Sequence, residues 1–190
     1  MFSFKANCID MFSFLITIES QTTIKQYLND ILAQLNNCLK STNLSIRIAG
    51  GECIALLLEL ADDDVLNINQ IDDLYDNLQT LATDSQKSKS KKVLREQRSN
   101  FRQILHTFVG DGYSKELIKF GQERLIISSW QQKRYYDTFC SVIGSGLNLH
   151  LSQNTLLRDI FDLGPVIVDF KPDKISKFEK VFFSLFNQIA

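Results

Sequence analysis

Apolar side chains recur every three or four residues along most of this chain, which is the spacing of one face of a helix. Such stripes run over 22–40 and over 71–81. Between them, the stretch 43–60 is apolar almost all round, which predicts the buried helix of its group. Gly50 and Gly51 lie inside this stretch, and we expect them to allow a neighbouring helix to approach closely.

A basic amphipathic helix is predicted over 83–108, with Thr83 or Asp84 capping its start. Its apolar arc consists of Val93, Leu94, Phe101, Ile104, Leu105 and Phe108. Beside that arc, basic residues at positions i, i+4, i+7 and i+11 form a stripe about 16 Å long. The residues of this basic stripe are Lys91, Arg95, Arg98 and Arg102. They are candidate contacts for nucleic acid or an acidic protein, and the alternative is an ordinary solvated face.

The pattern changes on both sides of these helices. Residues 1–20 are hydrophobic and predict a core helix whose neighbours are missing. After a Gly110-Asp111-Gly112 turn, we expect a hairpin from 117–120 and 125–128, helices over 130–143, 149–163 and 176–188, and an extended stretch over 166–170. The sequence therefore predicts a mainly α fold with a short β-hairpin.

Composition limits the choice of function. With 190 residues and 44% hydrophobic content, the chain can bury one sizeable core or two small ones. The net charge of −1 predicts no general affinity for polyanions. The charges are segregated, however, with acidic residues gathered over 62–76 and basic residues over 87–102. The longest apolar run near the start, 11–18, is too short to span a bilayer, so we expect a soluble protein without membrane contact.

No pattern of catalytic or ligand-binding residues emerges. Cys8, Cys38, Cys53 and Cys140 are widely spaced, which matches neither a zinc signature nor a disulfide framework. We interpret them as buried thiols in a reducing compartment. His106 and His150 are interpreted as structural. We expect no catalysis, metal, cofactor or small-molecule substrate.

Two further stretches have alternative interpretations. Gly144-Ser145-Gly146 precedes a helix and could offer N–H groups to a phosphate, but it lacks a P-loop pattern and better fits a helix–helix turn. Lys133 and Arg134 adjoin Tyr135 and Tyr136, a mixture of cations and rings found on RNA-stacking surfaces. The same mixture is common on any amphipathic helix, so nucleic-acid contact there is the less favoured of the two.

The order and spacing of several motifs over residues 20–183 resemble the interferon-related developmental regulator family. The motifs are SIRIAGGECIALLLELA (45–61), LATDS (81–85), Gln97-Arg98, Phe101-Arg102, Ile104-Leu105, KFGQERL (119–125), Trp130, Lys133-Arg134, Tyr136, Asp137, Phe139, Gly144-Ser145-Gly146, His150-Leu151, Asn154, Leu157-Arg158, Ile160-Phe161, Leu163-Gly164-Pro165 and Lys177-Phe178-Glu179.

The resemblance implies the end of an armadillo-like helical repeat region over 1–83, a basic amphipathic connecting helix over 84–109 and a family-specific C-terminal domain over 110–190. It implies a non-catalytic regulator in the cytoplasm, the nucleus or both. Family members act as ribosome-binding repressors of translation, and also as transcriptional co-regulators that work with other proteins. Ribosome or RNA is thus the expected partner, with regulatory proteins as the alternative.

This sequence departs from the family pattern in two ways. Family members have many more armadillo-type residues upstream, whereas here Met1 leads almost directly into the last repeats. They also continue beyond the Lys177-Phe178-Glu179 motif into a strongly basic tail, where this sequence ends at Ala190. We expect a diverged short form or an incomplete product, and the missing tail weakens the case for ribosome binding because phosphate contacts supply most of such affinity.

Overall fold

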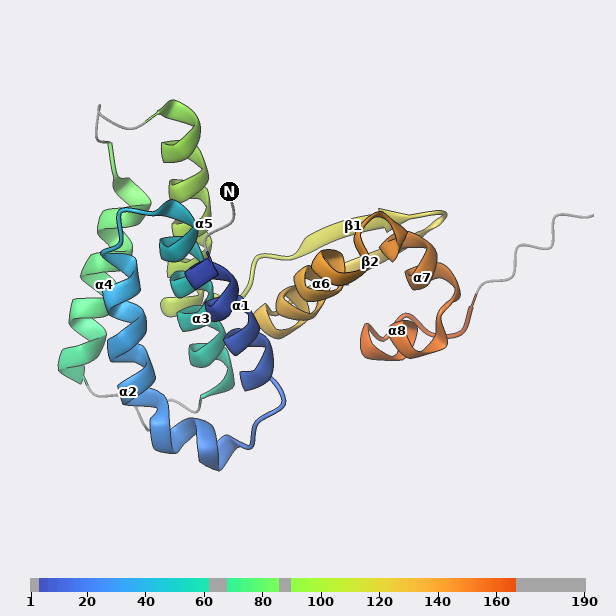
Figure 1. Cartoon of the computed structure of the whole chain (residues 1–190), viewed down its shortest axis with the longest axis horizontal. Coiled ribbons are helices and arrows are strands. Elements are labelled where there is room, and N and C mark those ends of the chain that lie inside the picture. Colours follow the sequence, from blue (N-terminus) through green and yellow to red (C-terminus); the bar gives the residue numbers. More distant parts are fainter. Residues whose placement is uncertain (1–3, 62–67, 86–89, 167–190) are drawn as a thin grey trace, which may run out of the picture.

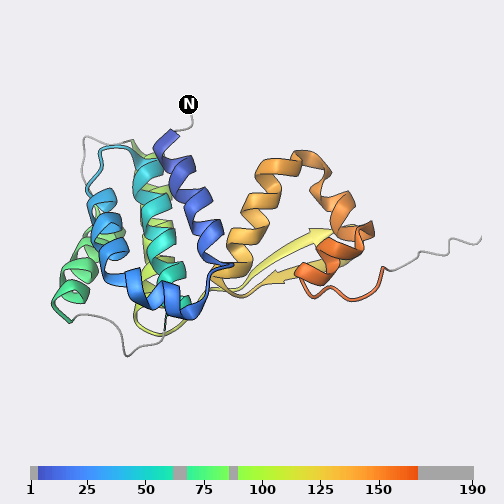
Figure 2. The same cartoon turned by 60° about the horizontal axis from the view of Figure 1, so that its bottom comes forward.

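The structure, a computed structural model, describes residues 4–61, 68–85 and 90–166 and is mainly α-helical with one small antiparallel hairpin (Figure 1). This confirms the predicted fold class. The elements are α1 (Phe4–Ile16), α2 (Gln21–Leu39), α3 (Leu44–Leu60), α4 (Ile68–Thr83), α5 (Lys91–Phe108), β1 (Glu116–Phe120), β2 (Glu123–Ile127), α6 (Trp130–Ile143), the 3-10 turn η2 (Gly144–Gly146), α7 (Leu147–Gln153) and α8 (Thr155–Ile160). Helices α1–α5 lie side by side as a helical layer, and the hairpin with α6–α8 lies beyond it (Figure 2).

Helix α3 is the centre of the helical layer, as its all-round apolar character predicts. Asn43 caps its start, with Oδ1 accepting a hydrogen bond from the Ser45 N–H at 2.9 Å. Neighbours α1, α2 and α5 pack around it. A Cβ placed on Gly51 would lie 2.8 Å from ring and methyl carbons of Phe101 and Ile104, and one on Gly50 would lie 3.0 Å from Cys38 Cβ. The predicted close approach at both glycines is confirmed.

The outer side of α1 is less buried than the sequence suggests. Ala6, Ser13 and Ile16 face the core, but much of the apolar surface of this helix is exposed. The exposed large side chains here are Phe4, Met11, Phe12, Leu15 and, just after the helix, Ile18. A groove of about 670 Å³ lies between α1 and α2 and is lined mainly by apolar atoms. The prediction of a core helix is therefore correct for one face of α1 only.

Helix α5 begins later than predicted. Helix α4 ends at Thr83, and α5 starts at Lys91, where the Ser90 Oγ accepts a hydrogen bond from the Val93 N–H at 3.3 Å. The predicted cap at Thr83 or Asp84 is therefore wrong. Residues 86–89, with the basic residues Lys87 and Lys89, lie outside the described part of the chain. Helix α5 packs along both α3 and α4 and so forms part of the helical layer.

The hairpin follows its prediction closely. Strands β1 and β2 pair in register from Glu116 opposite Ile127 to Phe120 opposite Glu123, so Gly121 and Gln122 form the turn. Gly121 adopts a φ of 55°, a conformation that glycine tolerates without strain.

The single helix predicted over 149–163 is wrong. Asn154 ends α7 in an extended conformation, and its Oδ1 then accepts from the Leu157 N–H at 3.2 Å as the cap of α8. A polar residue that can bond to the following backbone therefore divides the stretch into two short helices. The predictions for 176–188 and for 166–170 beyond Val166 fall outside the described residues, as does the acidic cluster Asp62–Asp64.

The two parts of the molecule are joined at the start of α6. The Glu59 carboxylate of α3 accepts hydrogen bonds from the backbone N–H groups of Trp130 at 2.7 Å and Gln131 at 3.0 Å. A negative group at a helix N-terminus also interacts favourably with the helix dipole. The Trp130 indole N–H donates to Thr107 Oγ1 at 2.6 Å, at the end of α5. These contacts fix the hairpin relative to the exposed face of α5.

Candidate functional site: a basic groove along α5

One face of α5 is buried and the other carries the basic stripe. Leu94, Phe101 and Ile104 are buried against the helical layer. Arg95 and Arg102 are exposed, and Arg98 is partly exposed. The structure thus places the apolar arc inward and the arginines outward, which is the arrangement that any contact with an external partner requires.

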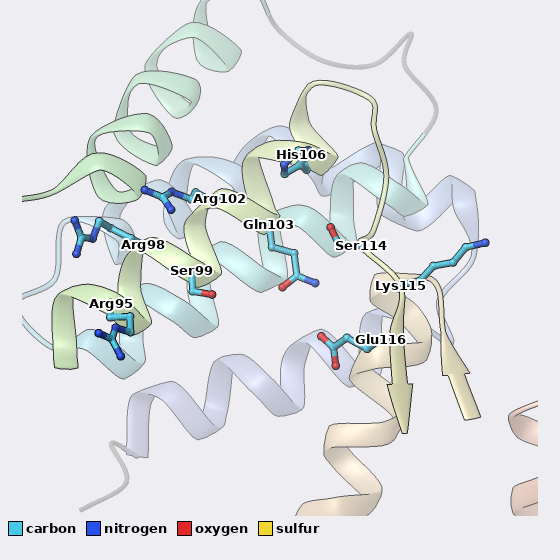
Figure 3. A pocket seen from close by; sticks show the side chains of 9 residues that line it. All are labelled: Arg95, Arg98, Ser99, Arg102, Gln103, His106, Ser114, Lys115 and Glu116. Atoms are coloured by element: carbon cyan, nitrogen blue, oxygen red, sulfur yellow. The ribbon is translucent and has the colours of Figure 1, made fainter. Parts of the chain in front are cut away.

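The arginines line an open groove of about 710 Å³ between α5 and the segment that leads into β1 (Figure 3). Six of the lining residues come from α5 and recur on one helix face, and three come from the facing segment. They are Arg95, Arg98, Ser99, Arg102, Gln103 and His106 on α5, with Ser114, Lys115 and Glu116 opposite. Tertiary structure therefore adds Lys115 and a second wall to the stripe expected from sequence.

The arginines of this groove have no acidic partner among the described residues. The Nε of Arg98 donates to the Leu94 carbonyl at 3.2 Å, and among the described residues the arginines of the groove form no ion pair. His106 Nδ1 lies 3.2 Å from an Asp111 carboxylate oxygen, with both side chains exposed. A concentration of unpaired guanidinium groups raises the local positive potential even though the chain is nearly neutral overall.

Not every predicted binding residue reaches the groove. Lys91 is exposed one helical turn before Arg95 and lies outside the lining. Lys133 is on α6, where its Nζ contacts the two Asp137 carboxylate oxygens at 2.7 and 2.6 Å. The structure therefore separates Lys133 from the basic stripe.

Arg134 needs correction as a candidate binding residue. Its side chain is only 7% exposed and donates to Asp10 at 2.8 Å and to Glu52 at 3.2 Å. It links α6 to α1 and α3, so its guanidinium serves an internal ion-pair cluster and is not available to a nucleic acid. The neighbouring rings are also used internally, since Tyr135 packs edge-on against Phe14 and Tyr136 against Phe161.

Glu52 in this cluster predicts an unusual pH dependence. Burial raises the pKa of its carboxyl from 4.5 to about 7, although Arg134 and Lys133 act in the opposite direction. Because the folded-state pKa lies above the unfolded value, ionisation of Glu52 costs stability as pH rises from about 4.5 to about 7. We expect Glu52→Gln to gain stability relative to wild type between pH 5 and pH 8, by about 2–3 kcal/mol at 1.36 kcal/mol per pKa unit.

Urea unfolding of both proteins across that pH range measures the effect. The glutamine side chain keeps an oxygen that can accept from Arg134, so the two stability curves should converge toward low pH. Parallel curves from pH 5 to pH 8 would show that the Glu52 carboxyl ionises equally easily in the folded and unfolded states.

One buried polar pair was missed by the sequence analysis. Arg47 Nη2 donates to Gln97 Oε1 at 2.7 Å, and both side chains are almost fully buried. Gln97 Nε2 in turn donates to the Leu81 carbonyl at 3.0 Å and to Asp84 at 3.2 Å. This network joins α3, α4 and α5 behind the basic stripe. The signal in the sequence was Arg47, a lone cation within an otherwise apolar helix.

The described residues give little support to thiol catalysis or metal binding. Burial raises the pKa of the Cys53 thiol to about 11, which works against a nucleophilic thiolate. Cys38 and Cys53 are buried and Cys140 is half-buried, whereas Cys8 is exposed, contrary to the expectation for all four. Among the described residues, no group of His, Cys, Asp and Glu side chains is placed to hold a metal ion. No helix in that part of the chain combines the length and apolarity needed to cross a membrane.

The described part of the chain is thus a helical layer with an open groove whose arginines have no ion-pair partner among the described residues. Comparison with known proteins identifies its family. Residues 3–109 match the sequence profile described as interferon-related developmental regulator, and residues 154–190 match the one described as interferon-related protein conserved region. The chain belongs to the interferon-related developmental regulator family, which confirms the resemblance seen in its motifs.

Individual relatives agree with this assignment. The chain is 43% identical over 188 residues to mouse interferon-related developmental regulator 2, a match that covers 96% of this chain and 42% of that protein. It is 39% identical over 183 residues to human interferon-related developmental regulator 1, covering 93% of this chain and 40% of the human protein. The chain therefore spans about two-fifths of the length of these relatives. The first family match ends at residue 109, directly after α5.

Proposed function

We propose that this chain is a non-catalytic regulatory protein, located in the cytoplasm or nucleus, that associates with RNA and with the ribosome through the groove along α5. The observation that carries the proposal is the row of Arg95, Arg98 and Arg102 along an open groove, without an internal ion pair among the described residues. Membership in a family named for regulation supports a regulatory role.

The charge distribution favours a phosphate backbone as the ligand. Arginine and lysine on one helix face can contact successive phosphates, and the release of condensed counterions then drives binding. The net charge of −1 means that this attraction comes from the groove alone and not from the protein as a whole. About four phosphate contacts are expected, from the three arginines on this helix face together with Lys91 at the start of α5 or Lys115 on the facing segment.

Binding should consequently depend steeply on salt. With about four phosphate contacts, the slope of log K against log salt is expected to be about −4 for duplex RNA and about −3 for single strands. Neutralising two contacts in Arg98→Gln plus Arg102→Gln should make that slope less negative by about 2. Fluorescence anisotropy of labelled RNA across a salt series measures both values.

A matched control is available on the hairpin. Lys119→Gln plus Arg124→Gln changes the net charge by the same amount at two exposed residues outside the groove, and it should leave the slope nearly unchanged. Cosedimentation with ribosomes at low salt extends the test to the proposed target. Ribosome binding that is indifferent to Arg98→Glu plus Arg102→Glu would reject the role of the groove.

A second candidate function is that of a protein–protein adaptor in transcriptional co-regulation. The observation that favours it is the apolar groove between α1 and α2, with Phe12 and Tyr27 partly exposed at its lining. Such a groove suits the apolar face of an amphipathic helix from a regulatory protein.

Crosslinking mass spectrometry in cells distinguishes the two candidates. Crosslinks from Lys91 or Lys115, beside the basic groove, to ribosomal components favour RNA association. Crosslinks from Lys5, at the apolar groove, to chromatin or co-repressor proteins that survive nuclease treatment favour the adaptor.

A further inference from the structure

The wall of the basic groove opposite the arginines carries a carboxylate. Among the described residues that line the groove, Glu116 is the acidic one. Figure 3 shows its side chain extending from β1 into the groove, with Gln103 reaching toward it from α5. A carboxylate at this position repels phosphates, so a groove that attracts polyanions by charge alone would bind better without it.

The position of Glu116 is fixed by its neighbours. The Tyr113 hydroxyl donates to Glu116 Oε1 at 2.5 Å. Tyr113 is itself buried, with its ring packed edge-on against Trp130 at a centroid distance of 4.9 Å. The Glu116 carboxylate is therefore held in one place by Tyr113, a side chain of the core.

The second carboxylate oxygen of Glu116 is available to a ligand. Among the described residues, Oε2 has no hydrogen-bond or ion-pair partner, and none of the groove arginines pairs with it. A fixed carboxylate accepts hydrogen bonds and donates none when ionised. The groove thus offers donors for anionic groups on one wall and an acceptor for a neutral donor on the other.

RNA carries this combination in its backbone. Each nucleotide has a phosphate and a ribose 2′-hydroxyl, and the 2′-hydroxyl is the group by which proteins distinguish RNA from DNA. Carboxylates recognise ribose hydroxyls in dinucleotide-binding proteins for the same chemical reason. His106 is the one ring among the described residues that line the groove, and its Nδ1 lies 3.2 Å from an Asp111 carboxylate oxygen, so we assign recognition there to the backbone and not to stacked bases.

We propose that the groove selects RNA over DNA, with Arg95, Arg98 and Arg102 contacting phosphates and the free oxygen of Glu116 accepting a hydrogen bond from a ribose 2′-hydroxyl. This inference rests on the proposed RNA association and assigns its source of selectivity. Tyr113 is the positioning residue in this arrangement.

The test compares three labelled single strands of one sequence, made as RNA, DNA and 2′-O-methyl RNA, by fluorescence anisotropy at low salt. One hydrogen bond to a charged group should favour RNA about tenfold over DNA. The 2′-O-methyl strand, which cannot donate, should bind like DNA. This comparison uses the wild-type chain and needs no variant. Equal affinity for the three strands would overturn the inference and leave the RNA association itself intact.

The variant Glu116→Gln then tests the role of the Glu116 carboxylate by itself. Its amide oxygen can still accept from Tyr113, while the atom facing the groove becomes a donor. RNA should then bind within about twofold of the 2′-O-methyl strand, because an amide N–H can donate to the 2′-oxygen of either but cannot accept from the 2′-hydroxyl, with circular dichroism and the salt slope unchanged. Glu96→Gln, an equal change of charge at an exposed residue of α5 outside the groove lining, should keep the full preference.

The outcomes separate the two proposals. Retention of the preference for RNA over the 2′-O-methyl strand in Glu116→Gln overturns the role of this residue. Binding of all strands that ignores Arg98→Gln plus Arg102→Gln would instead show that the groove is not the nucleic-acid site, and both proposals would fail.

Discussion

Replacing Arg158 with methionine is expected to destabilise the C-terminal part of the described chain by about 3–5 kcal/mol. The Arg158 side chain is 1% exposed, and Nη1 and Nη2 donate to the two Glu123 carboxylate oxygens at 2.9 and 2.7 Å. Its remaining donors bond to backbone carbonyls at distances of 2.8–3.0 Å, namely those of Leu151, Leu163, Gly164 and Pro165.

The size of this effect follows from what the substitution leaves behind. Methionine fills a similar space, but Glu123 and four carbonyls lose their donor, and buried groups without partners are costly. Lysine would retain the charge but cannot reproduce the forked geometry, so Arg158→Lys should also destabilise. The hydrogen bond from Arg158 holds the pKa of the Glu123 carboxyl below its usual 4.5. The stabilisation is therefore present above that pH and is lost as pH falls through the lower folded-state value.

Urea unfolding followed by circular dichroism and by the fluorescence of Trp130 measures this loss, and hydrogen exchange locates it. Arg124→Met, at an exposed position on the same hairpin, is the matched control and should change stability by less than about 0.5 kcal/mol. A loss below about 1 kcal/mol for Arg158→Met would mean that water replaces the missing donors.

Leu57→Ala is expected to destabilise the helical layer by about 2–5 kcal/mol. The side chain has no exposed surface and lies on α3, which packs against α1, α2 and α5. Truncation removes buried methyl groups and leaves a cavity that rigid helices on several sides cannot close. Leu57 also lines the groove between α1 and α2. The loss of stability will therefore be smaller if the walls of that groove move into the cavity, and larger if they do not.

Leu15→Ala provides the control for this substitution. It removes the same atoms from a side chain that is 55% exposed on α1, and it should cost less than about 0.5 kcal/mol. Chemical denaturation of the two variants beside wild type checks the difference. Similar losses for both would place α3 at the edge of the structure and not at its centre.

The two proposals depend on different features of the same groove. Attraction of a phosphate backbone depends on the arginines of α5, which Phe101 and Ile104 orient by anchoring the opposite helix face. Selectivity for RNA depends on Glu116, which Tyr113 holds in place. The hydrogen bonds of Glu59 and Thr107 to the start of α6 maintain the distance between the two walls of the groove, which are α5 and the segment that leads into β1.

Periodicity in the sequence determined most of the local structure. Helices α2, α3 and α6 and the hairpin lie where the apolar spacing predicted them, and the inward placement of Phe101 with the outward placement of Arg98 and Arg102 followed from helix geometry alone. The errors in local structure arose at polar residues. Ser90 and Asn154 start helices by accepting backbone hydrogen bonds, and a smooth hydrophobic pattern does not reveal which such residue acts as a cap.

Tertiary structure decided which charged residues are free to bind. Arg134 and Arg102 are both cations on amphipathic helices, yet the first is buried between Asp10 and Glu52 whereas the second lines an open groove. The second wall of that groove, with Glu116, comes from the segment that follows α5 after the turn at Gly110 to Gly112, and periodicity does not show that this segment returns alongside the helix. Periodicity reports the face on which a side chain lies, but the partner of a charge depends on contacts between residues far apart in the chain, and these are set only when the helices pack.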